Sequence, residues 1–256
     1  MSEGSACACA QAQLVSSRED AADTCAIIVA GGSGERFGDP RGKQFVELGG
    51  LPIAAWSILA FSEAPSVAQI VVVCSERRVR EMRRDVLDKL ELCHEVVLAP
   101  AGVTRQDSVF SGLMASRDDL PLVAIHDAAR PLIEVETIEN CLAAVRGQRG
   151  VDGAICASRS TDTLKVVDES GRIVGTPDRA RYWCAMTPQV FLRSKILRAH
   201  EMALLQGFEG TDDASLVEHA GGTVRVVESP RDNIKITVPE DLAIAEATLQ
   251  ARLGTV

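Results

Sequence analysis

The stretch CAIIVAGGSGERFG, at residues 25–38, runs from a short apolar segment directly into a glycine-rich loop. The apolar half has the length and β-branched content of a strand that is buried on both faces of a sheet. Glycines that directly follow a first strand allow backbone N–H groups to approach phosphate oxygens closely. This stretch therefore predicts an α/β protein with a phosphate site at the end of its first strand. The glycines taken alone would also suit an ordinary turn between a strand and a helix.

Two cations next to the glycines favour the phosphate site. Arg36 carries a planar fork of donors and Lys43 a point charge, and both suit a polyphosphate. Two familiar phosphate loops do not fit. A GxGxxG pattern begun at Gly32 matches Gly34 but finds no third glycine, and a Walker A loop needs Ser or Thr where Gln44 follows the lysine. The sequence indicates a third kind of phosphate loop.

Apolar β-branched runs and helical patterns alternate along the chain. Strands are expected at 25–30, 69–74, 95–98, 122–125, 153–157, 223–227 and 233–237, and helices at 52–62, 76–90, 106–116, 135–146 and 239–253. Near-continuous apolar strands alternating with helices predict an α/β fold with a mostly parallel sheet covered on both faces. This core is expected to form one domain over residues 25–256, after a disordered extension at 1–24.

Residues 160–180 interrupt the alternation. Two strand-like pieces, 163–167 and 172–176, flank the turn residues DESG at 168–171, which predicts a β-hairpin arm. Because such an arm has little core of its own to bury, we expect it to pack on another subunit in a homodimer.

Composition limits the partners of the chain. The 256 residues carry a net charge of −9 and 4% aromatic residues, which argues against a nucleic-acid partner, since such proteins need a basic face and stacking platforms. No apolar run is long enough to span a membrane, and the first 24 residues have no signal-peptide core. The eight cysteines show no CxxC pair, and Cys74 and Cys156 lie inside apolar runs. A cytoplasmic protein is expected.

Further motifs give the chain a family resemblance. After the glycine loop and PRGKQF (40–45) come TRQDSV (104–109), HDAARP (126–131), DTLK (162–165), TPQ (187–189), TDDAS (211–215) and DNIK (232–235). In this order they resemble the 2-C-methyl-D-erythritol 4-phosphate cytidylyltransferase family of the nucleotidyltransferase superfamily, which implies a Rossmann-like core. The resemblance runs from about residue 25 to about residue 253. It implies transfer of the CMP moiety of CTP to 2-C-methyl-D-erythritol 4-phosphate, with release of pyrophosphate, in the non-mevalonate isoprenoid pathway.

The segment 126–131 follows a predicted strand directly, at the edge where open α/β sheets bind ligands. Asp127 is the carboxylate placed to hold Mg²⁺ against triphosphate oxygens, and Arg130 is placed to hold an anionic substrate. An aspartate that caps the following helix is the alternative for Asp127. His126 is interpreted as structural, because an acceptor phosphate that is already ionised needs no general base.

Catalysis of phosphate attack then depends on alignment and on neutralising charge at phosphorus. Arg36, Lys43 and Lys235 are the cations expected to surround the phosphates, with Lys235 on the last predicted strand. An exposed strand lysine is the alternative for Lys235.

The resemblance also implies roles for short and polar residues. It assigns Ser108 to the cytosine, and it assigns Thr163 and Arg179 on the arm to the acceptor phosphate in the neighbouring subunit. The residues that it implies for nucleotide binding are Ala30, Gly31, Gly32, Gly34, Ser108, Asp127 and Ala128, and those for the polyol phosphate are Arg130, Thr163, Arg179, Thr187 and Thr211.

Two other functions stay open at this level. A ribitol-5-phosphate cytidylyltransferase would perform the same chemistry on a longer polyol. The HDAARP and DTLK motifs favour the methylerythritol enzyme. A nucleotide-binding regulator without turnover is the alternative from another class, and the intact set Arg36, Lys43, Asp127 and Lys235 argues against it.

Overall fold

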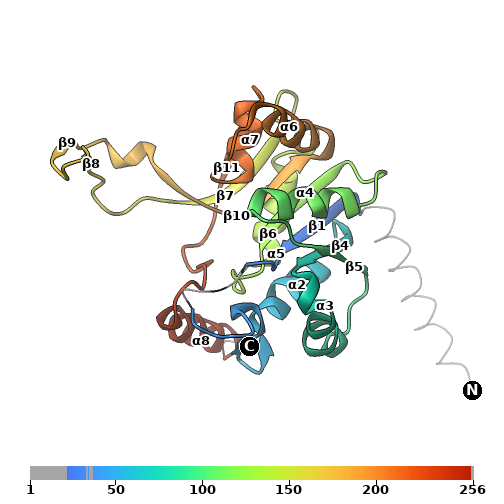
Figure 1. The fold of residues 1–256 in the computed structure, drawn as a ribbon. Coiled ribbons are helices and arrows are strands. Elements are labelled where there is room, and N and C mark those ends of the chain that lie inside the picture. The colour runs from blue at the N-terminus through green and yellow to red at the C-terminus, as the bar shows by residue number, and fades with distance from the viewer. Residues whose placement is uncertain (1–21, 33, 35–36, 255–256) are drawn as a thin grey trace, which may run out of the picture.

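A central seven-stranded sheet forms the core of the computed structural model, which describes residues 22–32, 34 and 37–254 (Figure 1). Its strand order is β11-β7-β10-β6-β1-β4-β5. These strands are β1 (Thr24–Val29), β4 (Val67–Cys74), β5 (Glu95–Pro100), β6 (Leu122–Asp127), β7 (Gly153–Arg159), β10 (Trp183–Leu192) and β11 (Val224–Glu228). Every pair is parallel except the two that β10 makes with β6 and β7. The predicted mostly parallel sheet is confirmed.

Helices cover both faces of this sheet. One face packs against α2 (Ile53–Glu63) and α5 (Val135–Ala143), and the other against α4 (Arg105–Ala115), α6 (Arg193–Gln206) and α7 (Asp213–His219). The last helix, α8 (Pro239–Leu253), packs instead on the small β2 (Glu47–Leu48) and β3 (Leu51–Pro52) pair. Shorter turns are η1 (Lys43–Phe45), η2 (Glu76–Arg78), α3 (Val79–Glu81), η3 (Met82–Val86), η4 (Leu87–Lys89) and η5 (Arg179–Arg181).

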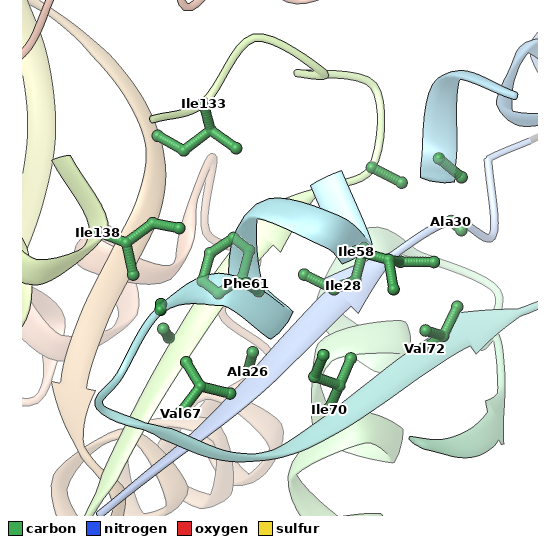
Figure 2. Packing of buried hydrophobic residues seen from close by; sticks show 14 of the residues in the cluster. Ala26, Ile28, Ala30, Ile58, Phe61, Val67, Ile70, Val72, Ile133 and Ile138 are labelled. Atoms are coloured by element: carbon green, nitrogen blue, oxygen red, sulfur yellow. The ribbon is translucent and has the colours of Figure 1, made fainter. Parts of the chain in front are cut away.

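The alternation of side chains along β1 explains why its sequence is apolar throughout. Ala26 and Ile28 point to one face, where Figure 2 shows them beside Phe61 of α2. Cys25 and Ile27 point to the opposite face, toward α4 and α6. All four of these residues are fully buried. Burial on both faces favours apolar side chains along the strand.

Two sequence expectations need correction. Residues 233–237 form no strand; they run as extended chain that is fastened by the Ile236 N–H to the Ala129 carbonyl (2.8 Å). The helix expected at 76–90 is not one regular α-helix. It consists of four short helical segments in succession, η2, α3, η3 and η4, of which only α3 is α-helical.

Pattern analysis also missed β10, α6 and α7. β10 contains Pro188, and proline within a run argues against a central strand. The structure accommodates it at an irregularity in the β7 pairing, between Ala185 and Gln189, and β6 pairs with β10 only from Gln189 onward.

The predicted hairpin arm is confirmed. β8 (Val166–Val167) and β9 (Ile173–Gly175) pair antiparallel and project away from the body of the protein (Figure 1). Val166, Val167, Ile173 and Val174 are each more than half exposed. The two short strands of the arm therefore expose apolar side chains on either side of the polar turn at 168–171.

Of the predicted extension at residues 1–24, residues 1–21 lie outside the described residues. Asp23 pairs with Arg146, and Thr24 begins β1 fully buried. Cys74 and Cys156 are buried as expected. Within residues 22–254, as far as they are described, no helix has the length and apolarity needed to cross a membrane.

Candidate active site

A cavity of about 450 Å³ opens at the carboxyl ends of β1 and β6, the edge of the sheet that the sequence indicates. Parallel pairing places the last residues of these strands, Val29 and Asp127, side by side. The cavity is lined by Val29, Ala30, Gly31, Gly32, Lys43, Gln44, Gly102, Val103, Thr104, Arg105, Ser108, Asp127, Ala128, Ala129 and Lys235.

The glycine loop forms one wall of this cavity. A side chain at Gly31 would place its Cβ 2.5 Å from the Ala101 Cβ, and Ser108 Oγ lies 3.7 Å from the same point. Gly32 faces open space, and within the described part of the chain no group accepts a hydrogen bond from the N–H of Gly31 or Gly32. Gly34 has φ +70°, which favours glycine. As far as the described residues show, the wall therefore offers two backbone donors that a close-lying ligand can use.

Arg36 lies outside the described residues, so its predicted place at the phosphates stays a prediction.

Ser108 lines the same cavity and lies next to Gly31 of the glycine loop. It lies in the first turn of α4, whose capping box pairs Thr104 with Asp107. Ser108 Oγ donates to the Thr104 carbonyl (2.9 Å) and accepts from the Gly102 N–H (3.1 Å). The structure thus brings Ser108 against the glycine loop, as the base-pocket prediction requires. Its contact with cytosine stays a prediction.

Four charged side chains are linked in a chain that starts at the cavity and ends in the protein interior. Lys235 Nζ donates to Asp127 Oδ2 (2.7 Å), and Arg105 Nε donates to Asp127 Oδ1 (3.2 Å). Arg105 Nη2 reaches a second carboxylate, Asp213 Oδ2, at 2.8 Å. Burial alone would raise the pKa of Asp127, but Arg105 and Lys235 hold that pKa well below its usual range. Burial does raise the pKa of Asp213.

The predicted cations Lys43 and Lys235 line one cavity although 191 residues of chain separate them. Lys43 Nζ donates to the Ile236 carbonyl (2.7 Å), and the Ile236 N–H is bound to Ala129. The extended chain at 233–237 therefore delivers Lys235 to Asp127. Lys235 thus contacts Asp127 although no strand carries it, and Lys43 lines the same cavity. The role of both lysines at the phosphates stays a prediction.

A second cavity of about 290 Å³ adjoins the first. Its lining includes the predicted substrate residues Arg130, Thr187 and Thr211. Arg105, Asp127 and Lys235 line both cavities, so these three side chains form the boundary between them.

Arg130 and Thr187 make internal hydrogen bonds at this second cavity. Arg130 Nη1 donates to the Asn233 carbonyl (2.8 Å), and its buried Nε has no partner among the described residues. Thr187 Oγ1 accepts from the Asp127 N–H (3.1 Å) and lies 3.0 Å from His126 Nδ1. The Thr187 hydroxyl thus orients Asp127, and its contact with a polyol stays a prediction.

His126 is fully buried, with Nε2 3.2 Å from the carbonyl oxygen of Arg130. Since that carbonyl can only accept, Nε2 carries the proton, and Nδ1 accepts from the Thr187 hydroxyl. Burial lowers the pKa of His126 to about 4. A neutral, enclosed imidazole agrees with the structural role interpreted for it.

The two predicted arm residues line neither cavity of their own subunit. Arg179 Nη1 donates to the Thr161 carbonyl (2.7 Å), and Arg179 and Thr163 are both exposed. The role of these two residues at an acceptor phosphate stays a prediction.

The metal-ligating prediction concerns Asp127 alone. Within the described ranges no three His, Cys, Asp or Glu side chains gather into a metal site. Each Asp127 oxygen receives one cation and keeps a second lone-pair position. One carboxylate together with triphosphate oxygens and water is the arrangement that Mg²⁺ favours. The residues present therefore fit a magnesium ion that arrives with a nucleotide.

Residue-level prediction missed Arg105, Asp213 and Gln189. Each belongs to a motif visible in the sequence, TRQDSV, TDDAS or TPQ, but the motif alone indicates no role for it. Gln189 Nε2 donates to Asp212 Oδ2 (2.8 Å) and Gln189 Oε1 accepts from the Ala214 N–H (3.0 Å), so it joins β10 to α7.

Comparison with known proteins gives matches over nearly the whole described chain. The family model "IspD: 2-C-methyl-D-erythritol 4-phosphate cytidylyltransferase" matches residues 24–251. Proteins of that name from Caldanaerobacter subterraneus subsp. tengcongensis and Prochlorococcus marinus are 39% and 42% identical, each over 88% of this chain and 98% of the relative. The crystal structure of 4-diphosphocytidyl-2C-methyl-D-erythritol synthase from Anaerococcus prevotii is similar, with a TM-score of 0.79 at 29% identity. That match covers 91% of this chain and 99% of the other.

Proposed function

The chain belongs to the 2-C-methyl-D-erythritol 4-phosphate cytidylyltransferase family and is a nucleotidyltransferase of isoprenoid biosynthesis, and we propose that its two adjoining cavities hold the two substrates. CTP binds in the larger cavity, with cytosine against the glycine loop and Ser108. The polyol phosphate binds in the smaller one. The observation that carries this proposal is the shared boundary, Arg105, Asp127 and Lys235, which lines both cavities.

The reaction joins an oxygen of the acceptor phosphate to the α-phosphorus of CTP. As that bond forms, the bond from the α-phosphorus to the oxygen bridging to the β-phosphate breaks, and pyrophosphate leaves with the electron pair. A phosphate monoester has a second pKa of about 6, so the acceptor is ionised near neutral pH. No base is needed, which agrees with a neutral, enclosed His126.

Lys43, Lys235 and the backbone N–H groups of Gly31 and Gly32 perform the electrostatic part of this reaction. They neutralise charge that spreads over the phosphate oxygens as the α-phosphorus becomes pentacoordinate. Both lysines are prepositioned, by the Ile236 carbonyl and by Asp127 respectively. Arg36 is proposed as a third cation.

Asp127 would hold Mg²⁺ together with triphosphate oxygens. When bound, this ion would supply charge neutralisation to the polyphosphate. The chain's own contribution is an ionised carboxylate, which Arg105 and Lys235 hold in place.

We further propose that the arm forms a homodimer and completes the partner's site. The exposed apolar side chains of the arm strands, Val166, Val167, Ile173 and Val174, form the kind of surface that association buries. In such a dimer Thr163 and Arg179 contact the acceptor phosphate in the partner's smaller cavity.

Pyrophosphate release is the direct test. The purified protein is incubated with Mg²⁺, one of the nucleotides CTP, ATP or GTP, and either 2-C-methyl-D-erythritol 4-phosphate or ribitol 5-phosphate. We expect rapid release with CTP and the methylerythritol substrate. Preference for ribitol 5-phosphate would reassign the acceptor, and tight CTP binding without release from any pair would indicate a non-catalytic regulator. ATP turnover within about threefold of CTP would contradict the base pocket.

A further inference from the structure

The guanidinium of Arg105 divides one of its edges between two carboxylates. Arg105 is the first residue of α4, and its Nε and Nη2 hydrogens point from the same edge of the planar group. Nε donates to Asp127 Oδ1 (3.2 Å), whereas Nη2 donates to Asp213 Oδ2 (2.8 Å). Asp127 therefore receives a single hydrogen bond from an edge that has two donors.

The same chain shows what this edge does when only one carboxylate is near. Arg84 donates from Nε and Nη2 to the two oxygens of Asp85, at 2.6 and 2.8 Å. Arg117 binds Asp119 in the same manner, at 3.0 and 2.5 Å. Such side-on pairs are stronger and more fixed in geometry than single contacts. At Arg105, Asp213 occupies the donor that would complete a side-on pair with Asp127.

Asp213 is held in place by the fold. It begins α7 with its side chain 1% exposed, and Asp212 caps the helix by accepting from the Ser215 N–H (2.9 Å). Gln189 of β10 binds Asp212 and the Ala214 N–H, which fixes the helix start to the central sheet. Asp213 Oδ1 has no partner among the described residues, so Arg105 is the ion partner of this carboxylate in the described structure.

We propose that Asp213 is a positioning residue that keeps Arg105 from capturing both oxygens of Asp127. The restraint leaves Asp127 with one contact per oxygen, from Arg105 on Oδ1 and from Lys235 on Oδ2. Lone-pair positions then remain for a divalent cation that arrives with the nucleotide. The inference rests on the proposed function only in taking Asp127 as the metal-binding carboxylate.

The metal dependence of CTP binding tests this positioning role without turnover. The dissociation constant of CTP is measured by calorimetry with Mg²⁺ and with EDTA, and their ratio gives the metal enhancement. In Asp213→Ala, Arg105 is free to pair side-on with Asp127, and we expect the metal enhancement to fall about tenfold, the scale of losing an outer-shell partner of a metal ligand. The metal enhancement of Asp213→Asn, which retains a neutral acceptor, should lie between those of the wild type and Asp213→Ala. Asp152→Asn is the matched control, because Asp152 pairs with Lys195 (2.9 Å) and lines neither cavity.

The possible results distinguish a positioning role for Asp213 from a merely structural one. A structural role would lower the melting temperature and weaken CTP binding equally with and without Mg²⁺, which leaves the ratio at the wild-type value and overturns the proposal. Folded Asp213→Ala and Asp213→Asn proteins with an unchanged ratio would overturn it too. A wild-type ratio near one with normal pyrophosphate release would overturn the inference and leave cytidylyl transfer standing. Absence of pyrophosphate release would refute the proposed function, while the ratio still decides the role of Asp213.

Discussion

Replacement of Gly31 by alanine tests how the glycine loop meets the rest of the cavity wall. The new Cβ would lie 2.5 Å from the Ala101 Cβ, whereas carbon atoms in contact are about 3.5–4.0 Å apart. The glycine loop and the segment after β5 that contains Ala101 must therefore move apart by roughly 1 Å. Gly31 has no positive φ, so alanine introduces no backbone strain, and the whole effect is steric.

The magnitude follows from overpacking a close contact. Such insertions typically cost about 1–3 kcal/mol. For a chain of this size, a cost of ~2 kcal/mol lowers the melting temperature by about 4–8 °C. Because Ser108 Oγ lies 3.7 Å from the added carbon, the same displacement widens the base pocket. A misplacement of about 1 Å in a binding site can cost up to two orders of magnitude, so we expect the KM for CTP to rise at least tenfold.

Gly32→Ala supplies the matched stability control, since its added Cβ meets nothing within 4 Å. Thermal denaturation and steady-state kinetics with varied CTP measure the two effects. Gly32→Ala should melt at the wild-type temperature. If Gly31→Ala also melts there and retains the wild-type KM, the tight contact between the two loops does not form the base pocket, and the reasoning fails.

Three further predictions concern the cavity lysines, the arm and a buried histidine. Lys43→Ala and Lys235→Ala should each lower kcat by roughly two orders of magnitude, the scale of a lost charge contact in the transition state, with little change in melting temperature. A stability loss with normal kcat would instead mean a structural lysine. Lys43→Ala and Arg179→Ala homodimers should each be nearly inactive, but co-expressed subunits should recover about a quarter of wild-type activity, because mixed dimers contain one intact site. Mixed dimers verified by mass that show no recovery would exclude a shared site. Burial lowers the pKa of His200 to about 4, so the folded state resists protonation of this side chain. The free energy of unfolding therefore falls as the pH drops from about 6.5 toward 4, by up to about 3 kcal/mol. The melting temperature of His200→Leu should therefore fall less over that pH range than that of the wild type. Equal decreases would contradict a lowered pKa of His200 in the folded state.

Local sequence by itself determined the strand that carries the site and the chemistry expected there. The run at residues 25–30 is apolar at every position because β1 is buried on both faces, and this requirement is visible without any tertiary contact. The glycines and Lys43 follow that strand within a few residues, so their place at its carboxyl end needed only the connectivity of the chain. The arm could also be predicted, since its turn chemistry lies in four consecutive residues.

Long-range contacts decided the structure of β10 and of residues 233–237 against their local sequence patterns. β10 contains Pro188, which the local pattern counts against a strand, and only the irregular pairing with β7 accommodates it. Residues 233–237 have a strand-like composition, but no sheet edge pairs with them, and they cross the end of the site as extended chain.

Tertiary structure alone decided the electrostatic arrangement of the site. Lys235 meets Asp127 across 108 positions of sequence, and Asp213 meets Arg105 across the same separation. The sequence motifs contain these charged residues, but the spacing of the motifs does not show which carboxylate each lysine or arginine contacts. That pairing depends on how β6, α4 and α7 pack, because a hydrogen bond requires atoms within about 3 Å, whereas residue order fixes only which strand ends share an edge.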